Sequence, residues 1–294
     1  MTLREALHVA RREGHALGHF NISDLAALKG IFDAAVELEV PIMIGVSEGE
    51  REFVGVRQTA ALIRSIREEY HYPIFLNADH THSLEKAEEA AAAGFDEVLF
   101  DGSKYSFEEN VKQTKKAVEA IKSINPNIIV EGEIGYIGSS SEILQETPEG
   151  AALTPQSFTT PEEARQFVAE TKVDVLAPAV GNMHGLLASM VNGKVKKHLD
   201  IERIKAIADV VPVWMTLHGG SGTEDKDFVA AIKAGITIVH VNTEIRLAWR
   251  LGLEAALKSN PHEVAPYKLL PGAVDAVKKV VADRLHLFTM GMPR

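Results

Sequence analysis

Eight short apolar runs, spread along the whole chain, constrain the fold more than any other feature of the sequence. Each run is rich in β-branched residues and has the length of a buried strand. Segments with helical spacing lie between the runs, and several begin with Ser, Thr or Asp as an N-cap. The runs are 15–22, 40–47, 73–80, 96–102, 127–135, 173–181, 211–219 and 236–243, and the clearest helical segments are 24–39, 83–93, 106–123 and 160–171.

This alternation predicts parallel strands that are buried on both faces, because near-continuous apolar strands leave no face for water. Closure into a (β/α)8 barrel, the TIM-barrel fold, is the simplest arrangement of eight such units, and an open doubly wound sheet is the weaker alternative. We expect a single α/β domain over residues 1–294, with extra helices at both ends. Residues 1–14 predict an amphipathic helix. Residues 244–283 predict two helices, the second of which would cover the barrel or a partner subunit.

The composition excludes several classes of protein. A formal net charge of −10 argues against a nucleic-acid partner, because phosphate backbones are held by clustered Lys and Arg. Because the chain has no cysteine, any transition metal must be held by Asp, Glu or the 12 histidines. No stretch approaches the roughly 20 apolar residues of a membrane span, and the N-terminus lacks the apolar core of a signal peptide. We therefore expect a cytoplasmic protein with no membrane partner.

Unusual polar residues gather at the carboxyl ends of the predicted strands. They are Asn21, Ser47, Asp79, His80, Asp101, Glu131, Glu133, His184, His218, His240 and Asn242. In barrel enzymes this face carries the chemistry, because its loops vary without disturbing the core. Polar residues also collect wherever strands end, but ordinary turns need Gly, Ser and Asn rather than histidines and paired acids.

Two predicted strands point pairs of polar side chains into the barrel. Glu131 and Glu133 alternate with apolar residues and so share one face of their strand, as His240 and Asn242 do on theirs. Two carboxylates inside a barrel repel each other and are costly to bury unless a cation or hydrogen-bond donors meet them. A metal is the simplest compensation, and an ion pair with Lys or Arg is the alternative.

Three further histidines are far apart in sequence but stand at predicted strand ends, where they fit a metal site. His80, His184 and His218 would give a three-histidine centre that leaves a position open for substrate oxygens. A lone buried histidine is more often structural, but here several strands end in one. Asp79 directly precedes His80, and adjacent strand residues face opposite ways. Both can serve one site only if the strand ends or bends at Asp79.

The segment HGGSG at 218–222 suggests an anion site. Small residues let backbone N–H groups approach an anion, and the helix predicted to start near Thr223 adds a favourable dipole. Gly-rich turns are common, so the position after the seventh strand, where barrels bind phosphate, carries more weight than the motif. Only Lys104 offers an amine near a strand end, which favours carbonyl activation by a metal over imine chemistry.

Short motifs follow one another in a fixed order through nearly the whole chain. They are FN at 20–21, SEG at 47–49, DH at 79–80, FDGS at 100–103, VEGEIG at 130–135, TTPEEA at 159–164, HG at 184–185, LHGGSG at 217–222 and VNTE at 241–244. In this order they resemble the class II, metal-dependent ketose-bisphosphate aldolases, which include fructose-bisphosphate and tagatose-bisphosphate enzymes.

The resemblance implies a role for each matched position. Asp79 would donate and accept the proton of the substrate's C4 hydroxyl. Zn²⁺ would be bound by His80, His184 and His218, with the acids Asp101 and Glu133 near the metal and, in some members, holding a second divalent cation. The dihydroxyacetone-phosphate part of the substrate, sometimes with a monovalent cation, would lie against Asn21, Ser47, Gly185, Gly219, Gly220, Ser221, Val241, Asn242 and Thr243.

Two positions depart from the family pattern. The glutamate that moves the C3 proton in this family falls on Ser141 here, while Glu142 lies one residue later. His240 stands where the family has an asparagine that contacts the enediolate, and its imidazole can act as acid, base or extra ligand. Glu142 and His240 are therefore further candidates for catalytic residues.

The resemblance implies a zinc-dependent aldolase that reversibly cleaves a ketose 1,6-bisphosphate to dihydroxyacetone phosphate and glyceraldehyde 3-phosphate. Fructose 1,6-bisphosphate is the first candidate substrate, and tagatose 1,6-bisphosphate or another ketose is the alternative. A metal-dependent sugar-phosphate isomerase or epimerase and a non-catalytic sugar-phosphate binder are the rival functions. The resemblance also suggests a homodimer or homotetramer.

Overall fold

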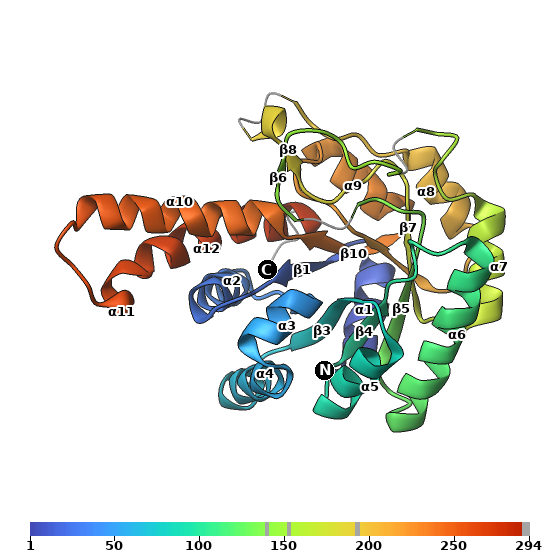
Figure 1. Cartoon of the computed structure of the whole chain (residues 1–294), viewed down its shortest axis with the longest axis horizontal. Helices are drawn as coiled ribbons and strands as arrows, with labels where there is room; N and C mark the ends of the chain where they lie inside the picture. The colour runs from blue at the N-terminus through green and yellow to red at the C-terminus, as the bar shows by residue number, and fades with distance from the viewer. Residues whose placement is uncertain (139–140, 152–153, 192–194, 290–294) are drawn as a thin grey trace.

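A closed barrel of eight parallel strands forms the centre of the protein (Figure 1). The computed structural model describes residues 1–138, 141–151, 154–191 and 195–289. The strands follow one another around the barrel in the order β1-β10-β9-β7-β5-β4-β3-β2. They are β1 (Leu17–Asn21), β2 (Ile42–Val46), β3 (Ile74–Thr81), β4 (Glu97–Phe100), β5 (Ile129–Ile134), β7 (Val175–Pro178), β9 (Trp214–Leu217) and β10 (Ile236–Val241). The predicted (β/α)8 barrel is thus confirmed.

Each barrel strand lies in one of the eight predicted runs, except that β3 extends one residue beyond its run. The short strands β6 (Ile143–Leu144) and β8 (Leu186–Leu187) pair with each other outside the barrel. They join the loop after β5 to the loop after β7. Both loops therefore meet above the carboxyl end of the barrel.

Helices surround the barrel, and the four clearest predicted helices are found within one residue of their expected ends. Ser83, Ser106 and Thr160 accept a hydrogen bond from a first-turn N–H, which explains where three of the helices begin. The helices are α1 (Leu3–Glu13), α2 (Leu25–Leu38), α3 (Glu48–Val54), α4 (Val56–Tyr70), α5 (Leu84–Ala93), α6 (Phe107–Ile124), α7 (Pro161–Thr171), α8 (Ile201–Ala208), α9 (Asp225–Ala234), α10 (Thr243–Ser259), α11 (Pro266–Leu269) and α12 (Pro271–Phe288), with a 3-10 turn, η1 (Ala188–Met190).

The amino-terminal end of the barrel is closed by apolar side chains. Leu3 and Leu7 of α1 pack in one cluster with Phe75, Ile129 and Trp214 from three different strands. This is the amphipathic helix expected at residues 1–14. This end is therefore filled mainly by apolar groups, whereas Asp79, His184, His218 and His240 lie toward the carboxyl end.

The carboxyl-terminal helices form a long hairpin that projects from the barrel (Figure 1). Helix α12 packs against α2, α10 and β1, and it buries Val277, Val281 and Leu285. This helix therefore covers the barrel, as one of the two sequence-based alternatives proposed. Across the described residues, no helix is long and apolar enough to cross a membrane.

Candidate metal centre

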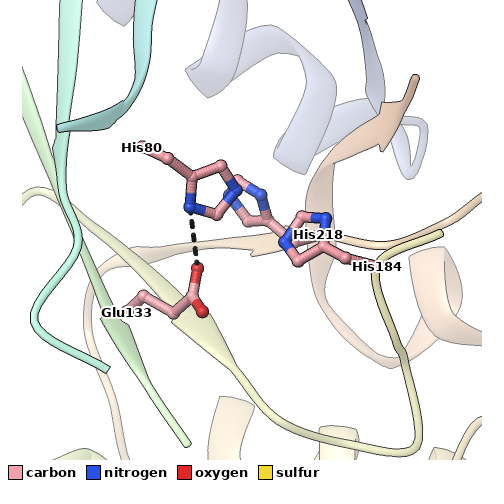
Figure 2. Close-up of side chains that lie close together, drawn as sticks. All are labelled: His80, Glu133, His184 and His218. Atoms are coloured by element: carbon pink, nitrogen blue, oxygen red, sulfur yellow. Dashed lines mark ion pairs between the residues drawn. The ribbon is translucent and has the colours of Figure 1, made fainter. Parts of the chain in front are cut away.

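Three histidines and one glutamate converge at the carboxyl end of the barrel (Figure 2). His80 lies near the end of β3, Glu133 lies on β5, and His218 directly follows β9. His184 comes from the loop between β7 and β8. One ligand atom from each of the four residues lies within 4.8 Å of the others. The structure therefore brings the three predicted metal-binding histidines together, with Glu133 beside them.

A bulge in β3 lets both Asp79 and His80 face this centre. The pairing of β3 with β4 gains an extra residue between Ala78 and Thr81, and His80 has a φ of 40°, in the left-handed region. The bend required by the sequence is thus present. The bulge matters because regular strand geometry would turn the side chain of either Asp79 or His80 away from the centre.

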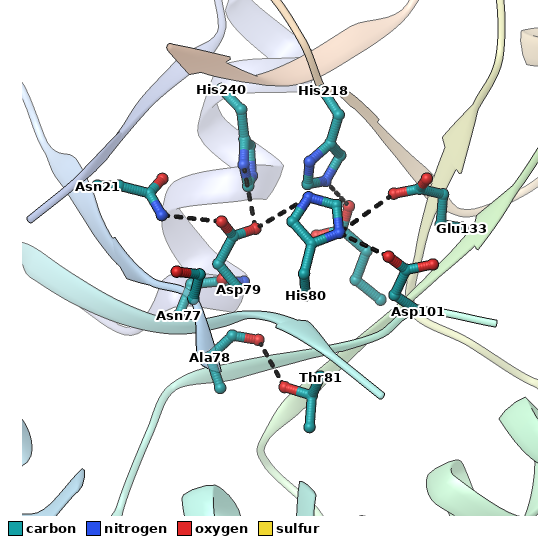
Figure 3. A network of polar contacts seen from close by, with 12 residues as sticks. Asn21, Asn77, Ala78, Asp79, His80, Thr81, Asp101, Glu133, His218 and His240 are labelled. Atoms are coloured by element: carbon teal, nitrogen blue, oxygen red, sulfur yellow. Dashed lines mark hydrogen bonds and ion pairs between the residues drawn. The ribbon is translucent and has the colours of Figure 1, made fainter. Parts of the chain in front are cut away.

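The buried guanidinium of Arg51, on α3, holds the bulge in place. Its Nη1 donates to the carbonyl oxygens of Val46 and Asp79, at 2.6 and 3.1 Å, and its Nη2 donates to Oγ1 of Thr81 at 2.9 Å. Thr81 Oγ1 also donates to the carbonyl of Ala78, at 3.3 Å (Figure 3). The backbone on both sides of His80 is therefore fixed. Sequence reasoning missed Arg51, which lies inside a helix and carries no motif.

Carboxylates orient two of the three imidazoles. His80 Nδ1 lies 2.8 Å from Asp101 Oδ2 (Figure 3). His218 Nε2 lies 2.9 Å from Glu131 Oε1. Ser103 in turn donates to Asp101 through its N–H and its hydroxyl, at 3.0 and 2.6 Å. A carboxylate behind a metal-binding imidazole fixes the ring and its tautomer. Asp101, predicted near the metal, thus lies behind His80, and the four-residue group does not include it.

Five nitrogen and oxygen atoms of the group that could bind a metal are buried and have no hydrogen-bond partner in the described part of the chain. They are His80 Nε2, His184 Nε2, His218 Nδ1 and both carboxylate oxygens of Glu133. A buried polar atom without a partner is costly, and a metal ion would satisfy all of these atoms together. Three imidazoles with one carboxylate are a donor set that suits zinc. The residues therefore fit the metal that the sequence predicted.

The electrostatics of the group also favour a cation. Burial lowers the pKa of His218 to about 3 and holds the pKa of His184 well below its ordinary value, so both imidazoles are neutral, as metal ligands must be. Burial raises the pKa of Glu133 well above its ordinary value. Burial acts to lower the pKa of His80, but nearby carboxylates, Asp79 first, raise it well above normal. The buried carboxylates of the centre therefore stabilise a positive charge placed among them.

Asp79 is held beside the metal group as an ionised carboxylate. Asn21 Nδ2 donates to Asp79 Oδ2 at 2.8 Å, while Oδ1 lies 3.6 Å from His240 Nδ1 and 3.7 Å from His80 Nε2 (Figure 3). Burial acts to raise the pKa of Asp79. The imidazoles around it, His80 first, and the Asn21 amide together outweigh burial and hold the pKa below its ordinary range.

His19 is a site residue that sequence reasoning missed. It is fully buried on β1 and stacks on His240, with ring centroids 3.3 Å apart and planes 9° apart. His19, Asp79 and His240 form a second group whose ligand atoms lie within 4.8 Å. Burial lowers the pKa of His19 to about 3 and that of His240 well below normal. The signal was available: His19 and Asn21 are two residues apart on one strand and share its inner face.

A polar chain links Asp79 to the rim of the barrel. Glu50 Oε2 accepts from Asn21 Nδ2 at 2.8 Å and from the N–H of Ser47 at 2.7 Å, and Glu50 Oε1 accepts from Arg246 Nη2 at 2.6 Å. Arg246 Nη1 donates to the carbonyl of Ser141 at 3.1 Å. Ser47 therefore contributes its N–H to this chain and lies at the start of α3, outside the cavity lining.

A small cavity opens beside the metal group. It is lined by Asn21, Asp79, Ser141, His184, Gly185, Gly219, Ser221, His240, Asn242 and Thr243. Most of the predicted substrate-binding residues are thus assembled around one space. Val241 is an exception, because its side chain is buried in the core between strands and helices. The side chain of Glu142 is exposed and outside the lining, whereas its neighbour Ser141 lies in it.

The glycine-rich segment after β9 forms a tight turn along this cavity. Gly219 and Gly222 have φ of 61° and 80°, and a side chain on Gly220 would press against the carbonyl oxygen of His240. Glu244 Oε1 accepts from the N–H of Gly222 at 2.7 Å, which ties the turn to the first turn of α10. The glycine-rich turn therefore lies beside the amino-terminal turn of α10, the kind of position at which an anion was predicted.

Comparison with known proteins identifies the family of the chain. The family model described as fructose-bisphosphate aldolase class-II matches residues 1–291. The chain is 33% identical to the fructose-bisphosphate aldolase of Thermus caldophilus, over 97% of this chain and 96% of that one. It is 32% identical to the sulfofructosephosphate aldolase of Alkalicoccus urumqiensis, over 96% and 94% of the two chains.

The solved structure of the YdjI aldolase from Escherichia coli K12 has a similar fold. Its TM-score is 0.80 at 28% sequence identity, and the match covers 97% of this chain and 96% of that one. The resemblance noted from the motifs is therefore confirmed. The protein belongs to the class II fructose-bisphosphate aldolase family, a family of lyases that generally depend on zinc.

Proposed function

We propose that the protein reversibly cleaves a ketose 1,6-bisphosphate, with fructose 1,6-bisphosphate as the first candidate, to dihydroxyacetone phosphate and glyceraldehyde 3-phosphate. The observation that carries this proposal is the position of Asp79. Its carboxylate is buried next to the three-histidine group and also lines the cavity that leads to the glycine-rich turn. A metal, a base and an anion site therefore share one space.

We propose that His80, His184 and His218 hold the catalytic zinc, with Glu133 close enough to contribute a carboxylate oxygen. When bound, zinc supplies a Lewis acid that polarises the C2 carbonyl and stabilises the negative charge that develops as the C3–C4 bond breaks. Asp101 and Glu131 orient His80 and His218 from behind. The chain itself thus provides ligands whose rings are fixed in orientation.

In this proposal Asp79 takes the proton of the C4 hydroxyl during cleavage and returns it during synthesis. Asn21 occupies Oδ2, which leaves Oδ1 directed toward the space between His80 and His240. Arg51 fixes the carbonyl of the same residue. Asp79 is therefore held through both its side chain and its backbone, which limits the reorganisation needed during the reaction.

One phosphate of the substrate would bind along the turn at 219–222 and the start of α10. Backbone N–H groups at a helix start favour an anion, and Gly185, Ser221 and Thr243 line the cavity there. Anchoring the phosphate fixes the reacting carbons relative to Asp79, so binding energy is converted into orientation.

The proton at C3 needs a separate acid–base group. His240 lines the cavity and contacts His19 and Asp79, whereas the side chain of Glu142 is exposed and lies outside the cavity lining. We therefore assign this transfer to His240 and keep Glu142 as the alternative that requires the loop around it to rearrange.

Replacing Asp79 by Asn should remove the base without removing the metal. Turnover should fall by about 10²–10⁴-fold, the range for loss of a general acid–base group, while zinc content by elemental analysis stays at the wild-type level. His262→Ala, at an exposed position beyond α10, is the control and should change neither quantity. Wild-type turnover in Asp79→Asn, or loss of its zinc, would contradict the assigned role.

Exchange of the C3 protons of dihydroxyacetone phosphate with deuterated water separates His240 from Glu142. His240→Asn should slow the exchange by about tenfold or more, because it removes the acid–base group. Glu142→Gln keeps the shape of the exposed side chain and should exchange at the wild-type rate. The opposite pattern would assign the proton transfer to Glu142.

A coupled assay of dihydroxyacetone phosphate release tests the reaction and its substrate. Relatives of equal similarity carry two different substrate names, so fructose 1,6-bisphosphate, tagatose 1,6-bisphosphate and a sulfofructose phosphate should be compared. We expect the fastest release from fructose 1,6-bisphosphate and its loss with a strong chelator. No release from any of them would favour a non-catalytic binder, and an isomerised or epimerised sugar would favour the rival enzyme class.

A further inference from the structure

A buried lysine lies directly behind the glycine-rich turn. Lys197 follows η1 in the chain and is only 6% exposed. Within the described residues, no carboxylate lies within ion-pair distance of its Nζ. Burying an ammonium group without an acidic partner is costly. Its surroundings must therefore supply another form of compensation.

That compensation comes from three backbone carbonyls. The Nζ of Lys197 donates to the carbonyl oxygens of Met183, Gly185 and Gly219, at 2.5, 2.7 and 3.2 Å. The three N–H groups of an ammonium match three acceptors, whereas a neutral amine has only two. Burial lowers the pKa of Lys197 to about 7, and the charge of Glu244 acts in the opposite direction. A cage of carbonyl oxygens is also how proteins surround a bare monovalent cation.

The three peptide units bound by Lys197 are hydrogen-bonded in turn to the loop after β5 and to β10. The N–H of His184 donates to Ile137 O, the N–H of Leu186 donates to Glu142 O, and the N–H of Gly220 donates to His240 O. Each of these N–H groups belongs to a peptide unit whose carbonyl oxygen accepts from Lys197. The ammonium therefore completes the hydrogen bonding of the segments that carry the cavity wall.

The backbone of Lys197 is joined to the same turn. Its N–H donates to Gly222 O at 2.8 Å, its carbonyl accepts from the N–H of Glu224 at 3.1 Å, and it forms a parallel bridge with Thr223. The lysine is thus anchored at both ends. It places one positive charge, with no acidic partner among the described side chains, next to the wall formed by Gly185, Gly219 and Ser221.

We propose that Lys197 is a tethered cation that organises the phosphate-binding wall of the cavity, so that the site needs no free monovalent cation there. It is a positioning residue: its ammonium holds the 183–185 and 219–222 segments in register and adds favourable potential for an anion. This inference rests on the proposed function, because it assumes that the turn receives a substrate phosphate.

The test compares Lys197→Ala with Lys196→Ala, the neighbouring and more exposed lysine. Binding of inorganic phosphate and thermal melting are measured in choline, sodium, potassium and ammonium chloride at equal ionic strength, together with zinc content. In choline chloride Lys197→Ala should bind phosphate about tenfold more weakly or worse, as expected for loss of hydrogen bonds from a charged donor. Potassium or ammonium ions should restore binding and raise the melting temperature, by filling the carbonyl cage.

Wild-type protein and Lys196→Ala should be insensitive to the choice of cation. The inference is overturned if Lys197→Ala binds phosphate as the wild type does in choline, or if no cation restores either its binding or its folding. If the wild type itself binds no phosphate, the phosphate site of the proposed function fails. Cation-dependent melting of Lys197→Ala then still decides whether the lysine acts as a tethered cation.

Discussion

The structure depends on positive charge supplied to a barrel mouth that is crowded with buried carboxylates. Asp79, Glu131 and Glu133 are buried toward this end of the barrel, each close to at least one imidazole. Such a cluster is unfavourable in a low-dielectric interior unless a cation is present. A zinc ion would satisfy the metal-facing atoms, and Lys197 would bring a second positive charge behind the glycine-rich turn, where it contacts the backbone on both sides of His184. The polar network of the site is arranged around these two charges.

The rest of the fold makes that arrangement rigid. The amino-terminal end of the barrel is sealed by α1 and apolar strand residues, which leaves the carboxyl end for the metal group and the cavity. His80, Glu133 and His218 lie on or next to barrel strands, so the sheet sets the distances between them, and His184 joins them from the loop after β7. The bulge at His80 is braced by Arg51 on the adjacent α3. Departure from regular geometry occurs where two neighbouring side chains must serve one site.

Much of this could be predicted from the sequence, because strand alternation and strand ends have clear signals. The eight runs identified the barrel, and their polar ends identified His80, His184 and His218. The bend at Asp79 followed from the alternation of side chains alone. His19 was missed although its alternation with Asn21 offered a signal, whereas Arg51, within a helix, and Lys197, in a loop with no motif, lack a local signal. Their roles arise from contacts between segments far apart in the chain.

X-ray absorption at the zinc edge of the zinc-loaded protein tests the central claim most directly. The account predicts three imidazole nitrogens at about 2.0–2.1 Å, the usual zinc–histidine distance, with the outer-shell scattering of imidazole rings. Removal of one ring by His184→Ala should reduce the imidazole count to two. A first shell of oxygen atoms without imidazole scattering, or the same imidazole count in wild type and His184→Ala, would contradict a centre built from these three histidines.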